Sequence, residues 1–167
     1  MTGEALVIGY GNVLRSDDGV GWHVVERLAE DPRLTGSTLL HVHQLTPELA
    51  LDISRATIVV LVDAQHGPDA GTCVVDRVAP DEDVATTWSH HLDPSSLTGL
   101  AIELYGNAPE VYTVGVGIAS LEAGDELSPE VRMALPEIAD AVVALVAGHA
   151  RNDAAVPAAA GQVVSHA

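Results

Sequence analysis

The fold of this chain follows from one stretch near its N-terminus, Ala5-Leu6-Val7-Ile8-Gly9-Tyr10-Gly11-Asn12-Val13-Leu14-Arg15-Ser16-Asp17-Asp18-Gly19. The apolar run at 5–8 predicts a short buried strand. The glycines after it predict a tight loop, in which the backbone turns sharply or passes close to another group. Beyond the loop, apolar residues recur at helical spacing and predict a helix over 20–28. A strand, a glycine loop and a helix in this order are typical of an α/β domain.

The rest of the chain alternates strand patterns with helix patterns. Further strands are expected at 37–43, 57–62, 72–78 and 111–116, with 72–78 as an antiparallel neighbour at a sheet edge. Capping residues followed by proline predict three more helices, which begin at Thr46-Pro47, at Asp93-Pro94 and at Ser128-Pro129. The alternation predicts an α/β fold: a mostly parallel sheet of about five strands with helices on both faces.

Length and composition indicate a single domain over 1–149, because 167 residues can bury a substantial core. The Ala/Gly-rich segment 150–167 lacks clear periodicity and is expected to be a disordered tail. No signal peptide or membrane span is evident in the sequence, so we expect a cytoplasmic protein.

The charge and cysteine content exclude several kinds of partner and site. A formal net charge of −17 argues against binding to nucleic acid or to an anionic membrane. The single Cys73 excludes an internal disulfide and a CxxC metal site. Cys73 lies in a predicted strand, where a small buried hydrophobic residue is expected rather than a nucleophile.

Acidic or imidazole side chains follow predicted strands at three positions. Asp18 lies after the first strand, Asp63 closes the third, and His90 or His91 lies in the long loop after the fourth. Strand ends converge on one rim of a doubly wound sheet, so these side chains could meet there. Two carboxylates and one imidazole would form a mixed oxygen and nitrogen site for a divalent transition metal, with open positions for water or substrate.

Each of these residues also has a plainer explanation. Asp17 and Asp18 could stabilise a helix N-terminus, Asp63 could form a turn, and the histidine pair could be solvated surface. The glycine loop also approaches a dinucleotide-binding fingerprint. Leu14 stands where the third glycine belongs, and the two carboxylates would repel a pyrophosphate, so no nucleotide cofactor is expected.

Four segments in order resemble the hydrogenase maturation proteases, the endopeptidases that process the large subunit of nickel–iron hydrogenases. The glycine loop around Ser16-Asp17-Asp18-Gly19 resembles the N-terminal signature of the family, and 58–64, which ends in Asp63-Ala64, resembles its second motif. Trp88-Ser89-His90-His91-Leu92 resembles the histidine segment, and 114–131 resembles the C-terminal signature. Together the segments extend over about Ala5 to Val146, essentially the whole predicted domain.

The resemblance implies a three-layer α/β/α sandwich with a twisted, mainly parallel sheet. It implies Asp18, Asp63 and His90 as metal-contacting groups, with Asp18 and Asp63 as catalytic residues of an aspartic-type endopeptidase. His90 is preferred to His91 because it directly follows Ser89. The metal implied is nickel that belongs to the substrate, a nickel–iron hydrogenase large-subunit precursor whose C-terminal extension is removed after nickel insertion. Either the metal or a carboxylate could activate the attacking water.

Two other functions remain open from the sequence. The same three residues could serve a non-catalytic docking or chaperone module that inspects the metal of a hydrogenase precursor. That module would bind the precursor without releasing a peptide. A nucleotide-binding α/β domain is the third possibility, and it would bind a dinucleotide without any need for Asp18.

Overall fold

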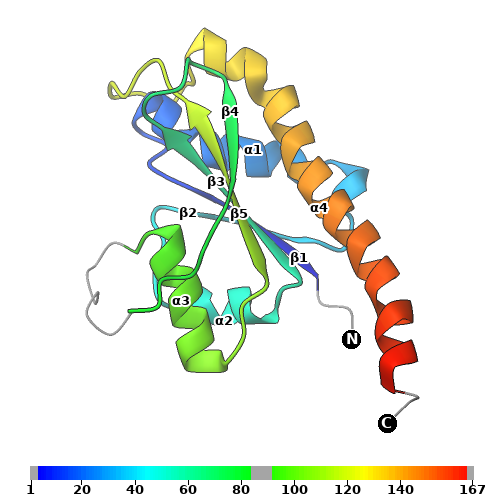
Figure 1. Cartoon of the computed structure of the whole chain (residues 1–167). Coiled ribbons are helices and arrows are strands. Elements are labelled where there is room, and N and C mark those ends of the chain that lie inside the picture. The colour runs from blue at the N-terminus through cyan, green and yellow to red at the C-terminus, as the bar shows by residue number, and fades with distance from the viewer. Residues whose placement is uncertain (1–3, 84–91, 165–167) are drawn as a thin grey trace.

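The computed structural model contains a five-stranded sheet in the order β2-β1-β3-β5-β4 (Figure 1). The structure describes residues 4–83 and 92–164. The parallel strands are β1 (Ala5–Tyr10), β2 (Thr38–Val42), β3 (Ile58–Gln65) and β5 (Glu110–Gly117). Strand β4 (Cys73–Arg77) lies antiparallel to β5 at the sheet edge, as its short connection from the preceding strand predicts.

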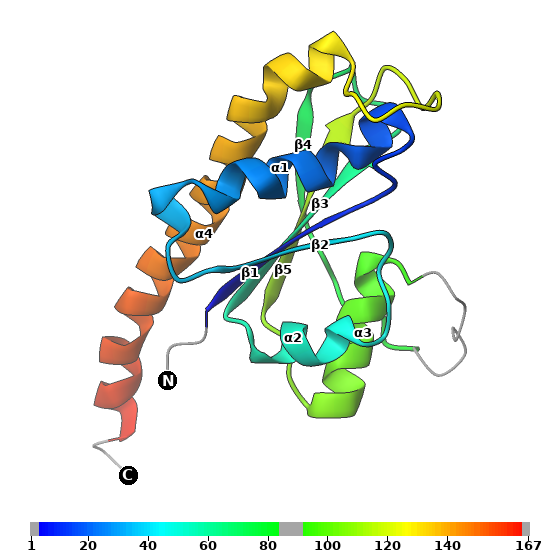
Figure 2. The same ribbon diagram turned by 180° about the vertical axis from the view of Figure 1, so that it is seen from behind.

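Helices cover both faces of this sheet (Figure 2). The α-helices are α1 (Val20–Ala29), α2 (Leu49–Arg55), α3 (Pro94–Tyr105) and α4 (Pro129–Val164). Two short 3-10 helices, η1 (Ser16–Gly19) and η2 (Pro32–Leu34), flank α1. The predicted α/β fold, with helices on both faces of a mostly parallel sheet, is confirmed.

Strand side chains alternate between two apolar clusters, as the two-residue period of a strand requires. Val7 of β1 and Val60 of β3 belong to the cluster beneath α1 and α4. Ile8 and Leu61, the next residues along, belong to the cluster beneath α2 and α3. All four side chains are at most 1% exposed. Burial on both faces explains why β1 and β3 read as continuous apolar runs rather than alternating ones.

Strand β3 and helix α2 differ in extent from the sequence prediction. Strand β3 continues past Val62 to Gln65, because β5 pairs with it through Asp63↔Gly115 and Gln65↔Gly117. Helix α2 begins at Leu49 rather than at Pro47. The amide of Leu49 donates to Thr46 O at 3.1 Å, so the segment 46–49 forms a tight turn. The sequence predicted the first turn of the helix at this place.

Helix α3 confirms both of its predicted ends. The side chain of Asp93 caps its N-terminus by accepting from Ser96 N at 2.8 Å. Gly106 ends it in the left-handed conformation, with φ 73°, which glycine adopts without steric cost.

Helix α4 runs through Pro136 and on to Val164. The sequence predicts a disordered tail from residue 150, whereas α4 extends to Val164, and the domain boundary at 149 stays a prediction. Ala-rich segments favour helix even without an apolar stripe, so the lack of apolar periodicity after residue 150 does not exclude a helix there. Within the described residues, no helix combines the length and apolar character needed to cross a membrane.

Candidate active site at the switch point of the sheet

Asp18 and Asp63 lie at the point where the order of the sheet reverses. The chain passes from β1 to β2 on one side of the sheet and from β3 through β4 to β5 on the other, so the crevice forms between β1 and β3. Asp18 lies in η1, which follows β1, and Asp63 lies near the carboxyl end of β3. Ligands of open α/β sheets bind at this place. The structure therefore brings together two of the three site residues expected from the sequence.

Glycines bring the loop and α1 close to the strand ends. A Cβ atom on Gly21 of α1 would lie 2.8 Å from Tyr10 N and closer still to Val62 O. Gly11 has φ 137°, a conformation that L-residues rarely adopt, and its α-carbon packs against the carbonyl of Asp18. These close approaches set η1 directly over the ends of β1 and β3.

Asp18 is half-buried and is held by the glycine loop. Its Oδ2 accepts a hydrogen bond from the backbone amide of Asn12 at 2.8 Å. Asn12 in turn accepts from Leu14 N at 2.9 Å through its side-chain oxygen, which braces the loop from inside. The carboxylate is therefore fixed by the backbone of the segment that precedes it.

Asp63 is also half-buried, and its environment favours the protonated form. Burial raises its pKa to about 7, and the negative charge of Asp18 adds to the rise. Hydrogen bonds from Ala64 N, at 2.7 Å, and from the Tyr10 hydroxyl act in the opposite direction. A carboxyl group with a pKa near 7 can accept or release a proton at neutral pH, which general acid–base chemistry requires.

Tyr10 was not identified as a site residue from the sequence. Its side chain is partly buried against the cluster beneath α2 and α3. Burial raises the pKa of its hydroxyl, and the charges of Asp63 and then Asp93 raise it further. Tyr10 therefore remains a neutral donor toward Asp63. The signal available in the sequence was its place between Gly9 and Gly11, directly at the end of the first strand.

Asp17 points away from the crevice and is completely buried, with 0% exposure. One oxygen, Oδ2, accepts from Ala119 N at 2.8 Å, Ser120 N at 3.0 Å and Ser128 Oγ at 2.8 Å. The other, Oδ1, accepts from Ser128 N at 2.8 Å. Burial alone would raise the pKa of Asp17, but these hydrogen bonds outweigh it and lower the pKa below its usual value. The two adjacent carboxylates therefore differ in environment.

The plainer explanation considered for the acidic pair is right for Asp17. It stabilises a helix N-terminus, although the helix is α4 rather than α1, because Ser128 directly precedes Pro129. The sequence does not predict this contact, because Ser128 lies far from Asp17 in the chain.

His90 and His91 lie outside the described residues, so the third expected metal-contacting group stays a prediction. Within residues 4–83 and 92–164, no group of three or more His, Cys, Asp and Glu side chains could hold a metal ion. The described part of the site therefore supplies a pair of carboxylates. Cys73 is half-buried in β4, where burial raises the pKa of its thiol, as expected for a packed rather than a nucleophilic cysteine.

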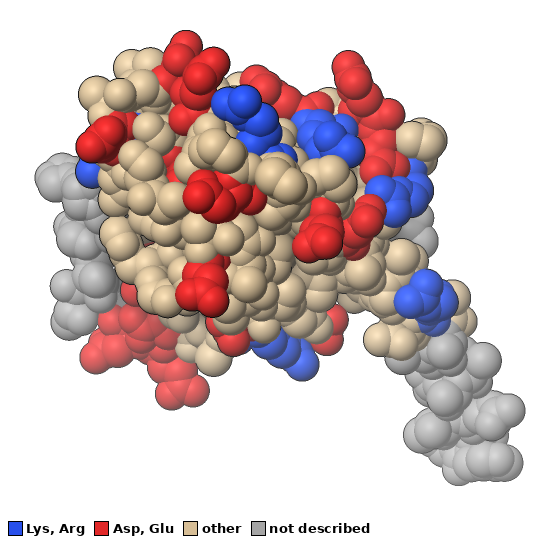
Figure 3. All heavy atoms as spheres, turned by 90° about the horizontal axis from the view of Figure 1, so that it is seen from above, with Lys and Arg blue, Asp and Glu red and all other residues tan. Residues whose placement is uncertain are grey.

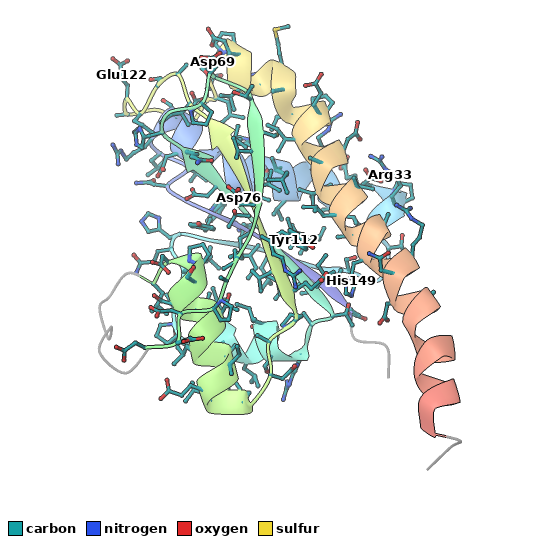
Figure 4. The ribbon with its side chains drawn as sticks, viewed as in Figure 1. Arg33, Asp69, Asp76, Tyr112, Glu122 and His149 are labelled. Carbon is teal, nitrogen blue, oxygen red and sulfur yellow. The ribbon has the colours of Figure 1, made fainter. Side chains whose placement is uncertain are left out.

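The loop 118–128 connects β5 to α4, with Glu122 near its tip (Figure 4). Seen from this end of the molecule, acidic side chains are spread over the surface among fewer basic ones (Figure 3). The fold and this site together define a three-layer α/β protein with a carboxylate pair at the switch point of its sheet.

Several solved structures with a similar architecture are hydrogenase maturation proteases. The hydrogenase maturating endopeptidase HybD from Escherichia coli is 26% identical, with a TM-score of 0.66 over 87% of this chain and 93% of that chain. A hydrogenase 2 maturation peptidase from a Thaumarchaeota archaeon is 27% identical, with a TM-score of 0.67 over 86% and 98%. The maturation protease HycI from Thermococcus kodakarensis, 22% identical with a TM-score of 0.68 over 86% and 92%, shares the fold.

No protein-family model matches this sequence, and no curated protein matches it. The structural likeness, which extends over most of the chain, confirms the resemblance to the hydrogenase maturation proteases that the four sequence motifs indicated. It also confirms the expected enzyme class, because these neighbours are hydrolases that act on peptide bonds.

Proposed function

We propose that this chain is the endopeptidase that removes the C-terminal extension from a nickel–iron hydrogenase large-subunit precursor after nickel insertion. The observation that carries the proposal is the carboxylate pair Asp18 and Asp63 at the switch point of a maturation-protease fold. Both side chains are half-buried and fixed by backbone amides, so they are positioned before a substrate arrives.

Nickel enters this proposal as part of the substrate. Carboxylate oxygens and an imidazole nitrogen are suitable donors for a divalent transition metal, and an incomplete set can dock onto a metal that a partner already holds. Asp18 and Asp63 would supply the oxygens and His90 the nitrogen. The charge of Asp93 acts on Tyr10, which hydrogen-bonds to Asp63, so Asp93 lies within electrostatic reach of the site.

Hydrolysis needs few groups beyond these. Water adds to the scissile carbonyl carbon and gives its proton to a carboxylate, Asp18 or Asp63, acting as general base. The carbon–nitrogen bond then breaks, and the leaving amine takes a proton from the same carboxyl group. Bound nickel would hold the precursor against this pair and polarise groups near it.

The test is the intact mass of a nickel-loaded large-subunit precursor before and after incubation with the protein. A loss equal to a C-terminal peptide, absent with nickel-free precursor, is expected. Asp18→Asn and Asp63→Asn keep an oxygen for the bonds from Asn12 N and Ala64 N, so the fold should survive while processing is lost. Asp76→Asn, on the exposed side of β4 (Figure 4), is the matched control and should process normally.

Two results would contradict the proposal. Processing at the wild-type rate by both site variants would remove Asp18 and Asp63 from the reaction. Stable complex formation without any loss of mass would favour the non-catalytic docking module instead.

A further inference from the structure

The carboxylate of Asp17 joins two segments that are far apart in the sequence. Its four donors belong to Ala119, Ser120 and Ser128, so it contacts both the beginning and the end of the loop 118–128. The distances of 2.8–3.0 Å are those of well-formed hydrogen bonds, and the bonds are charge-assisted because the acceptor is an ionised carboxylate. A fully buried carboxylate without such partners would be strongly unfavourable, so these contacts must stay closed in the folded protein.

Backbone hydrogen bonds continue the same connection. Ser16 N donates to Gly124 O at 2.8 Å, Asp17 N donates to Ser120 O at 3.2 Å, and Gly124 N donates to Leu14 O at 2.9 Å. The Ser16 hydroxyl donates to Glu122 O at 2.7 Å. The segment 14–17 and the loop 118–128 therefore form one hydrogen-bonded unit.

This unit maintains an uncommon backbone conformation beside the candidate catalytic group. Among the described residues other than glycine, Ser16 alone has a positive φ, 51°. That left-handed conformation costs free energy for a residue with a Cβ atom, and it persists only where its surroundings enforce it. The bonds of Ser16 and Asp17 to the loop provide the enforcement, two residues before Asp18.

Asp18 shares the single turn of η1 with Asp17, so a shift of one displaces the other. We propose that Asp17 is a positioning residue for peptide cleavage: its bonds to the loop 118–128, above all to Ser128, fix the turn that directs Asp18 into the crevice toward Asp63. This inference rests on the proposed endopeptidase function. The two adjacent carboxylates then have different roles: Asp17 holds the loop 118–128, and Asp18 contacts the substrate.

Ser128 allows a test that spares the charge of Asp17. Ser128→Ala removes the hydroxyl donor at 2.8 Å, and Ser128→Thr restores a hydroxyl at the same place. Steady-state processing of nickel-loaded precursor should show kcat reduced about 10- to 100-fold in Ser128→Ala, with KM within about twofold of wild type. Ser128→Thr should recover most of kcat. Ser54→Ala is the matched control, because that hydroxyl donates to Leu51 O at 2.7 Å in α2 and should leave kcat unchanged.

Asp17→Asn is the second variant, with Asp31→Asn as its control. Asp31 also caps a short helix, η2, through Arg33 N, but on another part of the surface. Asp17→Asn should lower kcat at least as much as Ser128→Ala, while Asp31→Asn should not. An unchanged kcat in Asp17→Asn, or an equal loss in Ser128→Ala and Ser128→Thr, would overturn the positioning role.

Hydrogen–deuterium exchange separates this inference from the proposed function. If wild-type protein processes no precursor, the proposed function fails whatever Asp17 does. Amide exchange then still reports the geometry: Ser128→Ala should speed exchange over 12–19, and Ser54→Ala should not. Unchanged exchange over 12–19 in both Ser128→Ala and Asp17→Asn would overturn the inference by itself.

Discussion

Asp63 and Asp18 lie close enough to interact electrostatically: burial raises the pKa of the Asp63 carboxyl group to about 7, and the negative charge of Asp18 adds to the rise. Both effects oppose ionisation of Asp63. A hydrolytic site needs a group whose pKa lies near neutral pH, so that it can accept and release a proton. The same two effects make Asp63 unfavourable for stability whenever it is charged. At Asp63, therefore, the environment that favours catalysis also lowers the stability of the folded protein.

The first prediction concerns the stability of Asp63→Asn and its dependence on pH. The folded-state pKa of Asp63 exceeds its ordinary value of 3.8, so the contribution of Asp63 to the unfolding free energy falls as the pH rises from about 4 through 7. Asparagine has no proton to lose and stays neutral, so we expect the variant to be more stable than wild type at pH 8 by on the order of 2 kcal/mol. At pH 4 the two proteins should be equally stable. Urea unfolding at both pH values measures the difference.

Asp76→Asn is the control for this experiment, because Asp76 is exposed at the sheet edge. Its unfolding free energy should follow wild type at both pH values. A loss of stability in Asp63→Asn at pH 8 would mean that the Asp63 carboxylate is stabilised, not strained, by its surroundings.

The second prediction concerns Asp17, whose shift has the opposite sign. Its folded-state pKa lies below the ordinary value of 3.8, so its stabilising contribution is complete above that pH and disappears as the pH falls through the folded-state pKa. Asp17→Asn should therefore cost about 2–3 kcal/mol at pH 7 and much less in strong acid. A pH-independent cost in urea unfolding would show that the charge of Asp17 is not what holds the loop 118–128.

The third prediction concerns the close approach of α1 to the sheet. Gly21→Ala would place a Cβ atom against Val62 O and Tyr10 N, both of which are backbone atoms that cannot rotate away. We expect the variant to lose about 2–4 kcal/mol of unfolding free energy, since α1 must move off the strand ends. Processing should be impaired as well, because η1 moves with α1. Thermal unfolding and the precursor mass assay measure the two effects.

Gly148→Ala is the opposite control for the same substitution. In α4 the nearest atom to its added Cβ is Arg151 Nη2, at 3.9 Å, so nothing obstructs the methyl group. Alanine favours helix over glycine by about 0.5–1 kcal/mol, and this variant should therefore be slightly stabilised. Equal effects of the two substitutions would contradict the close approach at Gly21.

The parts of this structure that the sequence predicts are those whose signals come from residues close together in the chain. The apolar runs of β1 and β3 and the caps of α3 are local signals, and each predicted its element. The end of β3 was not predicted, because the ladder to β5 continues beyond the apolar residues. The carboxyl end of a strand carries polar residues when it borders a crevice, so apolar periodicity underestimates its length there.

In the candidate site, too, local signals could be predicted and contacts between distant residues could not. Position after predicted strands identified Asp18, Asp63 and the pair His90 and His91, and the family resemblance selected His90. Both histidines lie outside the described residues. The different roles of Asp17 and Asp18 could not be assigned, because both precede the helix in the same way. The distinction depends on Ser128, which is 111 residues away in the chain and is brought to Asp17 only by the tertiary fold. A serine before Pro129 indicates a helix cap, but not which carboxylate it will meet.

The last prediction tests the domain boundary at 149. Residues Ala150 to Ala154 are exposed, whereas Ile138 and Val142, in the preceding part of α4, are fully buried. Removal of 150–167 should therefore change Tm by less than about 2 °C and leave processing intact. Ile138→Ala removes buried methyl groups and should cost about 2–5 kcal/mol. If the truncated chain loses as much stability as Ile138→Ala, the C-terminal segment packs against the domain and the boundary lies further along the chain.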